Sequence, residues 1–195
     1  MFQTRRPTEE EIAARLTSPG EFSYPEVGAT NNLGPSPPES IVATYDLDRH
    51  EFPIGAGRDL FDRARDSLLA WRHFEIPWLE FHGGSAPVRT GQVVATLVSG
   101  AGFWFLNPCR VVYTELTPDE GDIAAFAYGT LSGHAECGEE RFQVSFNRNT
   151  GEVDYKISAF SRPAILLAKL GYPFARKLQR RFAEASAKAL VRAAT

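Results

Sequence analysis

Residues 129–142 hold an unusual density of side chains that could do chemistry. The stretch contains His134 and the carboxylates Glu136, Glu139 and Glu140, interleaved with glycines. Histidine and glutamate are common general acids and bases in enzymes, and a β-sheet does not need them for its own stability. We therefore expect a pocket here, with His134 or Glu140 as the candidate general acid or base.

Whether these groups face a core depends on the strand that follows them. On residues 141–147 every second side chain is apolar: Phe142, Val144 and Phe146. If the strand runs back unbroken, Glu140, Glu136 and His134 share this apolar face, and a buried carboxylate must then be paired or take up a proton. A bulge at Gly138 would reverse the order. An inward Glu140 and a surface hairpin are both compatible with the pattern.

A metal site is not expected. His134-Ala-Glu136 resembles the His-x-Glu of zinc deaminases, but the Pro-Cys-x-x-Cys element that completes such sites is missing. Cys109 and Cys137 do not stand in a Cys-x-x-Cys pair that would supply ligands. We predict no metal and no cofactor, and His134 can equally be a polar residue of a turn.

A second candidate site lies at Ser161-Arg162-Pro163. Serine is a common N-cap and proline suits the first helical turn, so we expect the last helix to begin here. Arg162 would then stand beside the helix N-terminus, where an anion is favoured. The alternative is a surface arginine that pairs with one of the many acidic residues.

Aromatic residues are numerous enough to line a cavity, or else simply to fill the core. Those that could do so are Phe103, Trp104, Phe105, Tyr113, Phe126, Tyr128, Phe160 and Phe174. Small-molecule pockets combine an apolar lining with a few placed polar groups. The predicted ligand-binding residues are Tyr128, Glu136, Glu140, Arg162, Phe126, Trp104 and Phe174.

The first forty residues are expected to form a segment of their own, ahead of a domain at 41–195. Thr8 and Glu11 make a capping box that predicts a short first helix. Residues 18–40 are rich in Pro, Gly, Asn and Ser, which predicts a long surface loop or linker.

The remaining elements must position the candidate site. We expect a strand at 41–47, a helix at 57–73 with one apolar stripe, and a run of strands. The strands are predicted at about 77–82, 91–99, 109–117, 122–131, 140–147 and 152–160. Turn residues separate them, at Gly83-Gly84, Gly100–Gly102, Asn107-Pro108, Pro118–Gly121 and Asn147–Gly151. Connections this short predict an antiparallel sheet.

The last helix should lie on this sheet. Its apolar face comprises Leu170, Phe174, Leu178, Phe182, Ala185 and Ala189. Gly171-Tyr172-Pro173 is expected to kink it. The fold class is therefore α+β, with a curved antiparallel sheet of about six to seven strands wrapped around a long C-terminal helix.

Composition limits the possible classes of protein. The chain has 195 residues and is 43% hydrophobic, enough for one domain with a core. No signal peptide or apolar stretch long enough to span a membrane is visible. Two cysteines are too few for a disulfide framework. We expect a cytoplasmic protein with reduced thiols.

Charge is distributed unevenly. Residues 163–195 carry seven basic side chains and one acidic one, which leaves 14 basic and 23 acidic for the rest. The basic helix either packs against the acidic body or makes weak contact with an anionic surface such as a membrane.

Three blocks of the sequence resemble a known family. They are Phe22–Thr30, the Tyr128–Phe142 region with Gly133-His134 and Gly138-Glu139-Glu140-Arg141-Phe142, and Phe160–Pro163. In this order they are similar to DUF1990 (UPF0548), an uncharacterised family of bacterial and plant proteins, over about residues 22 to 192. The resemblance implies a family without implying an activity.

The expected architecture also resembles the helix-grip proteins of the START and Bet v 1 superfamily. That resemblance implies an apolar cavity between the sheet and the last helix. The first hypothesis is therefore binding of a small hydrophobic or amphipathic molecule. The second is an enzyme of cyclase, dehydratase or hydrolase type that uses His134 or Glu140. The third is an interaction module that works through the basic helix. No nucleic-acid partner is expected.

Overall fold

The computed structural model describes residues 2–34, 36–100, 102–116, 122–164 and 172–195. They form an antiparallel sheet of order β2-β8-β7-β6-β5-β4-β3, with β1 paired to β5. The strands are β1 (Phe2–Gln3), β2 (Asp46–Ala56), β3 (Leu79–His82), β4 (Val93–Gly100), β5 (Phe103–Leu116), β6 (Ile123–Thr130), β7 (Glu136–Phe146) and β8 (Glu152–Pro163). The helices are α1 (Glu9–Thr17), α2 (Glu39–Thr44), α3 (Arg58–Leu69) and α5 (Tyr172–Ala194), with short 3-10 turns η1 (Ala29–Asn32) and η2 (Arg72–Phe74).

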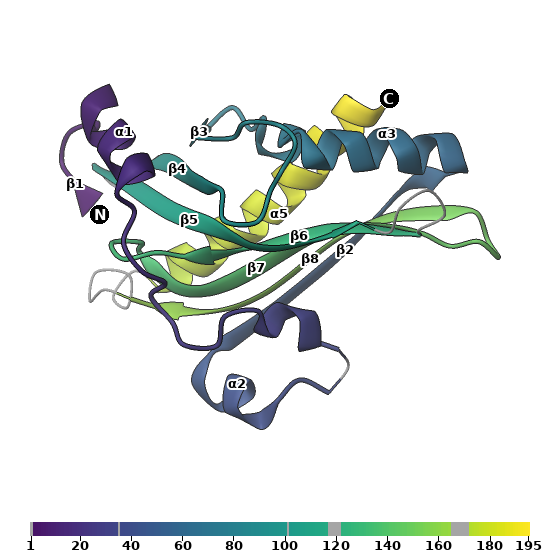
Figure 1. The fold of residues 1–195 in the computed structure, drawn as a ribbon, viewed down its shortest axis with the longest axis horizontal. Helices are drawn as coiled ribbons and strands as arrows, with labels where there is room; N and C mark the ends of the chain where they lie inside the picture. The colour runs from purple at the N-terminus through teal and green to yellow at the C-terminus, as the bar shows by residue number, and fades with distance from the viewer. Residues whose placement is uncertain (1, 35, 101, 117–121, 165–171) are drawn as a thin grey trace.

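The sheet separates two sides of the molecule (Figure 1). The long helix α5 and the helix α3 lie on its concave side, and the segment that contains α2 lies on the other. This arrangement confirms the predicted α+β fold, a curved antiparallel sheet around a long C-terminal helix.

The main core lies between the concave face and the two helices. From β6, β7 and β8 it takes Phe126, Phe142 and Tyr155, and from α5 it takes small residues such as Ala183 and Ala187. Small side chains on the helix let its backbone come close to the aromatic sheet. At one end of α5 this packing gives way to a cavity.

Part of the N-terminal segment packs on the convex face of the sheet. Tyr24, Ile41 and Tyr45 form a second buried cluster with Cys137 and Phe160 of the sheet. The capping box of Thr8 and Glu11 is present and begins α1 as predicted.

The strand predicted at 41–47 is wrong in its first half. Residues 39–44 form α2, and the strand begins only at Asp46. The helix places Ile41 and Tyr45, four residues apart, on one side, and both are buried in the convex cluster. Tertiary burial therefore overrides the β-branched composition.

The turn predicted at Asn107-Pro108 is also wrong, because both residues lie within β5. Pro108 stands just beyond Cys109 and Thr130, the last pair that β5 makes with β6. The carbonyl of Pro108 accepts from Leu131 N, so this edge of Pro108 faces the chain just after β6. The N–H that proline lacks would point to the same side, beyond the last β5–β6 pair, and its absence interrupts no pair of that ladder. The turn predicted at Pro118–Gly121 lies outside the described residues.

Ser161-Arg162-Pro163 does not cap the last helix. These residues end β8, where Pro163 pairs with Glu136 and Ser161 with Gly138. In the described chain α5 begins at Tyr172, so Pro173 lies in its first turn, where a proline costs no helical hydrogen bond. The predicted kink involves Gly171, which, like Leu170, lies outside the described residues.

Part of the positive charge of α5 is used within the molecule. Arg176 pairs with Asp48, Arg181 lies over the ring of Trp78 at 4.7 Å, and Arg192 donates to the carbonyl of Glu75. Arg180 and Lys188 are exposed. Several basic side chains of α5 thus pack against the body of the protein, which is one of the two roles expected for this helix.

Both cysteines are buried and free of disulfide bonds. Within the residues that the structure describes, no helix is long and apolar enough to cross a membrane.

Candidate functional site

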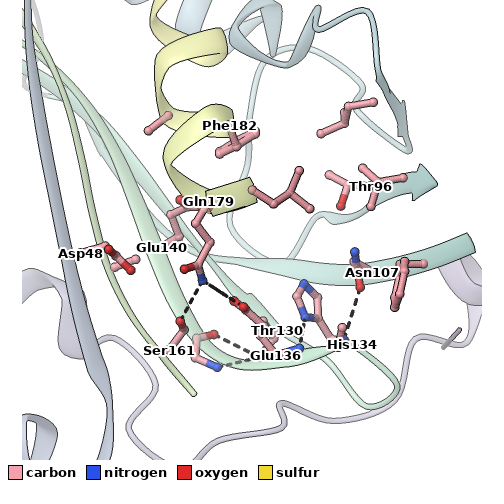
Figure 2. Close-up of a pocket in the computed structure, with 18 of the residues that line it drawn as sticks. Asp48, Thr96, Asn107, Thr130, His134, Glu136, Glu140, Ser161, Gln179 and Phe182 are labelled. Atoms are coloured by element: carbon pink, nitrogen blue, oxygen red, sulfur yellow. Dashed lines mark hydrogen bonds between the residues drawn. The ribbon is translucent and has the colours of Figure 1, made fainter. Parts of the chain in front are cut away.

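A cavity of about 540 Å³ opens between α5 and the concave face of the sheet. The strands β4, β5, β7 and β8 form its floor and α5 its roof (Figure 2). Much of the wall is aromatic or aliphatic: Trp78, Leu79, Val98, Phe103, Phe105, Leu178 and Phe182. A cavity of this size and lining falls in the range of small-molecule sites.

Glu140 supplies one polar group of the wall. It lies directly opposite Tyr128 in the β6–β7 ladder, and the Tyr128 hydroxyl donates to Glu140 Oε2 at 2.8 Å. Burial raises the pKa of Glu140 to about 7, and the nearby carboxylates of Glu136 and Asp48 act in the same direction. The carboxyl can therefore gain or lose a proton near neutral pH.

Glu136 supplies the second carboxyl. Gln179 of α5 donates its amide to both carboxylate oxygens, at 3.0 and 2.8 Å, and also reaches Ser161 Oγ at 3.3 Å. Burial raises the pKa of Glu136, although the Gln179 hydrogen bonds oppose the shift. This contact ties the helix to β7 and β8 at the end of the cavity (Figure 2).

His134 lies in the turn between β6 and β7. The backbone N–H of Glu136 donates to His134 Nδ1 at 2.9 Å, so a neutral ring carries its proton on Nε2. Burial lowers the pKa of His134 to about 3, which keeps the ring neutral. In Figure 2 the other ring nitrogen lies on the side turned toward the cavity, where it can act as a hydrogen-bond donor.

Asp48 and Asn107 complete the polar part of the wall. Arg176 of α5 donates to both carboxylate oxygens of Asp48, which compensates that charge. Asn107 Oδ1 accepts from the backbone N–H of Ala135 at 3.3 Å, which leaves its amide nitrogen available to the cavity. The polar groups gather at the end of the cavity nearest the β6–β7 turn.

The structure brings four of the expected residues to one cavity: Tyr128, His134, Glu136 and Glu140. The reason is the continuous β7–β8 register, which pairs Glu136 with Pro163 and Glu140 with Ala159 without a bulge at Gly138. Even-numbered residues of β7 therefore face the concave side, so the inward alternative for Glu140 is the observed one.

Three other expected ligand contacts lie away from the cavity. Arg162 follows Ser161 and so faces the convex side, over the Tyr45 ring at 5.2 Å. Trp104, between Phe103 and Phe105, packs against the α1 side of the sheet. Phe126 is buried in the main core. The alternation of side chains along a strand explains the first two cases.

Of the aromatic set considered from the sequence, Phe103, Phe105 and Tyr128 contribute rings to the wall, whereas the ring of Phe160 is buried in the convex cluster. Tyr113 lies on the convex side, where its hydroxyl bonds Thr30. The side chain of Phe174 lies outside the described part of the chain.

Sequence reasoning missed the role of Glu139. This residue is 2% exposed and faces the convex side, opposite to its neighbour Glu140. Its carboxylate accepts from Tyr24 Oη at 2.7 Å, Gly28 N at 2.7 Å, Thr30 N at 3.0 Å and the Thr30 hydroxyl. One feature of the sequence could have indicated this contact: Glu139 and its partners lie in two of the blocks that resemble the family, residues 138–142 and 22–30.

Asp48, Asn107 and Gln179 were also not predicted. Each comes from a different element, and no local pattern in the sequence marks them. Among the described residues, no three side chains of His, Cys, Asp or Glu are grouped so that they could hold a metal ion.

The curved sheet, the helix that it grips and the cavity between them define a helix-grip protein. Solved structures agree on the fold. A hypothetical protein from Helicobacter pylori, jhp0584, aligns with a TM-score of 0.54 and 13% identity over 90% of this chain and 97% of its own. The Zhui aromatase/cyclase from Streptomyces sp. R1128 aligns with a TM-score of 0.50 and 17% identity over 77% and 93%.

The chain belongs to the family described as Domain of unknown function (DUF1990), whose profile matches residues 23–189. A UPF0548 protein of Deinococcus radiodurans is 34% identical over 100% of this chain and 99% of its own length. A UPF0548 protein of Dictyostelium discoideum is 30% identical over 99% and 95%. The family expected from the sequence blocks is thus confirmed.

Proposed function

We propose that this protein binds a small hydrophobic or amphipathic molecule in the cavity between the sheet and α5. The observation that carries the proposal is the cavity itself, about 540 Å³ with a mostly apolar wall and a polar end. A concave space of this size, with an apolar lining and a few placed polar groups, is typical of small-molecule sites.

Binding can be tested with the neutral fluorophore N-phenyl-1-naphthylamine. We expect its fluorescence to rise on saturable, one-site binding. Val98→Phe should weaken binding at least about tenfold, because Val98 faces the cavity and a larger ring would fill it. The matched control is Ser99→Phe, which places the same ring one residue along β4 at an exposed position.

The folded state of both variants is checked by circular dichroism. If Val98→Phe does not fold, Thr96→Phe serves as a second blocking variant on the same face. Equal binding by the blocking and control variants would contradict the proposal. Native mass spectrometry of gently purified protein, with extraction of any bound molecule, would identify the natural ligand class.

The convergence of Glu140, Tyr128 and His134 favours a second candidate function, acid–base catalysis on the bound molecule. A carboxyl whose pKa is raised to about 7 by burial can take and return a proton near neutral pH. His134 Nε2–H could donate a hydrogen bond to a carbonyl oxygen while Glu140 removes a proton from the adjacent carbon.

This second function can be tested with 2-decanone in D₂O. Glu140 would take a proton from a carbon next to the carbonyl, and the enol would regain deuterium from solvent. We expect deuterium at these positions, seen by NMR, and a loss of at least about 100-fold in Glu140→Gln. Incorporation at the buffer rate would remove this candidate.

A further inference from the structure

Among the described residues, the cavity wall carries more negative charge than the neighbouring positive charge compensates. Four acidic residues line it, Asp48, Glu136, Glu139 and Glu140, and among the described lining residues none is lysine or arginine. Asp48 is paired with Arg176, and Glu139 directs its carboxylate to the convex side. Two carboxyls, those of Glu136 and Glu140, remain at the cavity.

Both of these carboxyls have neutral hydrogen-bond donors. Gln179 donates to Glu136, and Tyr128 donates to one oxygen of Glu140. The other oxygen of Glu140 has no hydrogen-bond partner among the described residues. A neutral donor satisfies an oxygen but does not cancel a buried charge, whose desolvation is costly.

The raised pKa values of Glu136 and Glu140 agree with a site in which the carboxylates lack a cationic partner. Burial is the largest cause of the raised pKa of both Glu140 and Glu136. The titratable groups that interact with Glu140 are Tyr128, Tyr155, Cys109, Glu136 and Asp48, none of them cationic. Arg176, which pairs with Asp48, lowers the pKa of Glu136 but is not among the groups that act on Glu140. A cation beside Glu140 would lower its pKa and hold it ionised at neutral pH.

The rest of the wall also suits a ligand that carries a positive charge. Trp78, Phe103, Phe105 and Phe182 contribute aromatic rings to the wall, of which Trp78 already carries Arg181 over its ring. Aromatic faces attract ammonium groups as well as apolar chains. An anionic head would instead meet carboxylates of its own sign.

We propose that the cavity selects amphipathic cations, namely an amine or a quaternary ammonium carried on an apolar body. The charged head lies beside Glu140 and Glu136, and the apolar body lies along the aromatic wall. This inference rests on the proposed ligand-binding function and specifies the chemistry of the ligand.

The test compares three probes with the same chain and different heads: decyltrimethylammonium, 1-decanol and decyl sulfate. None of them titrates between pH 6 and 8. Each displaces N-phenyl-1-naphthylamine below its micellar concentration at fixed ionic strength. At pH 8 we expect the cation to bind at least about tenfold more tightly than the alcohol, and the sulfate more weakly than the alcohol.

The pH dependence gives a second readout. Because Glu140 takes up a proton as the pH falls below about 7, the advantage of the cation over the alcohol should shrink from pH 8 to pH 6. The affinity for 1-decanol should change little. Tyr128→Phe removes a hydrogen bond that lowers the pKa of Glu140, so it should move this transition to higher pH.

Glu140→Gln should lower the affinity for decyltrimethylammonium relative to that for 1-decanol about tenfold, which removes the advantage of the cation. The matched control is Glu184→Gln, an exposed glutamate of α5 outside the cavity. If Glu140→Gln does not fold, the Tyr128→Phe profile decides the question.

The two proposals fail in different ways. If the alcohol or the sulfate binds as tightly as the cation, or the preference survives in Glu140→Gln, the selection of cations is wrong and the ligand-binding function stands. If neither the fluorophore nor any of the three probes binds, the ligand-binding function is itself wrong.

Discussion

At the scale of the residue, two neighbouring glutamates of β7 have different environments. Glu139 faces the convex side and accepts from Tyr24, Gly28 and Thr30. Glu140 faces the cavity and accepts from Tyr128 alone among the described residues. Since successive side chains of a strand point to opposite faces, one glutamate anchors the N-terminal segment and the other is presented to a ligand.

Glu139→Gln should be strongly destabilising. The amide replaces one carboxylate oxygen by a donor that meets other donors, so hydrogen bonds to a charged acceptor are lost in a buried position. We expect the free energy of unfolding to fall by about 3 kcal/mol. Urea denaturation measures this free energy. Glu140→Gln should change the free energy of unfolding by less than about 1 kcal/mol, because Glu140 accepts one hydrogen bond from a neutral donor, Tyr128. If both variants lost the same free energy of unfolding, the anchoring role of Glu139 would be contradicted.

His73 is a buried residue that we expect to lower the stability of the folded protein. It is fully buried among aromatic rings, and neither ring nitrogen has a hydrogen-bond partner among the described residues. We expect His73→Leu, similar in volume and apolar, to stabilise the protein by about 1 to 3 kcal/mol at pH 7, because it removes unsatisfied polar atoms.

The same variant should change the response to acid. Burial lowers the pKa of His73 in the folded state to about 3, from the ordinary histidine value of 6.5 that the unfolded chain retains. Between these values the unfolded chain binds a proton that the folded chain does not, so stability falls as the pH falls through the window. Thermal unfolding from pH 7 to pH 4 should show a smaller loss in His73→Leu than in the wild type. An unchanged slope would contradict this.

At the scale of the element, β7 is held close to β8 by Gly138. A Cβ built at this position would lie 2.0 Å from the carbonyl oxygen of Phe160, and φ is +157°. The close approach allows the β7–β8 ladder to extend to Pro163, which places Glu136 at the cavity. Glycine here is therefore a requirement of the site as well as of the sheet.

Gly138→Ala should lower the free energy of unfolding by about 2 to 4 kcal/mol, because the backbone of β8 must move away. It should also weaken binding of N-phenyl-1-naphthylamine, since Glu136 and Ser161 shift with the strands. The control is Gly34→Ala, where no atom lies within 4 Å of the added Cβ. If Gly138→Ala matches the control, the close approach has no energetic role.

At the scale of the whole molecule, the sheet has a ligand side and an anchoring side. The cavity lies on the concave side with α5, and the described residues of 22–34 and 36–45 pack on the convex side. A ligand that binds the folded protein and not the unfolded chain stabilises the folded state. Ligand binding should therefore be visible as a gain in the stability of the whole fold.

A bound probe at 100 times its dissociation constant should stabilise the protein by about 2.7 kcal/mol. We expect the midpoint of thermal unfolding to rise with 1-decanol in the wild type and in Ser99→Phe. Val98→Phe, whose cavity is filled, should show little rise. A similar rise in all three would indicate that the probe acts outside the cavity.

Much of the fold could be predicted from local patterns. The capping box at Thr8, the apolar stripe of α3 and the alternation along β7 each depend on neighbours within a few residues. The errors occurred where distant parts of the chain decide the outcome. Ile41 is helical because Phe160 buries it, and Pro108 fits a strand because β6 ends beside it.

The sequence by itself determined the family, the antiparallel sheet with its C-terminal helix, and the stretch around His134 and Glu140. These depend on residue order and periodicity. Only the tertiary structure decided which face each carboxylate occupies, because that depends on strand register, and which partners it meets. Tyr24 reaches Glu139 and Gln179 reaches Glu136 across many residues of chain, and a linear pattern contains no record of such contacts.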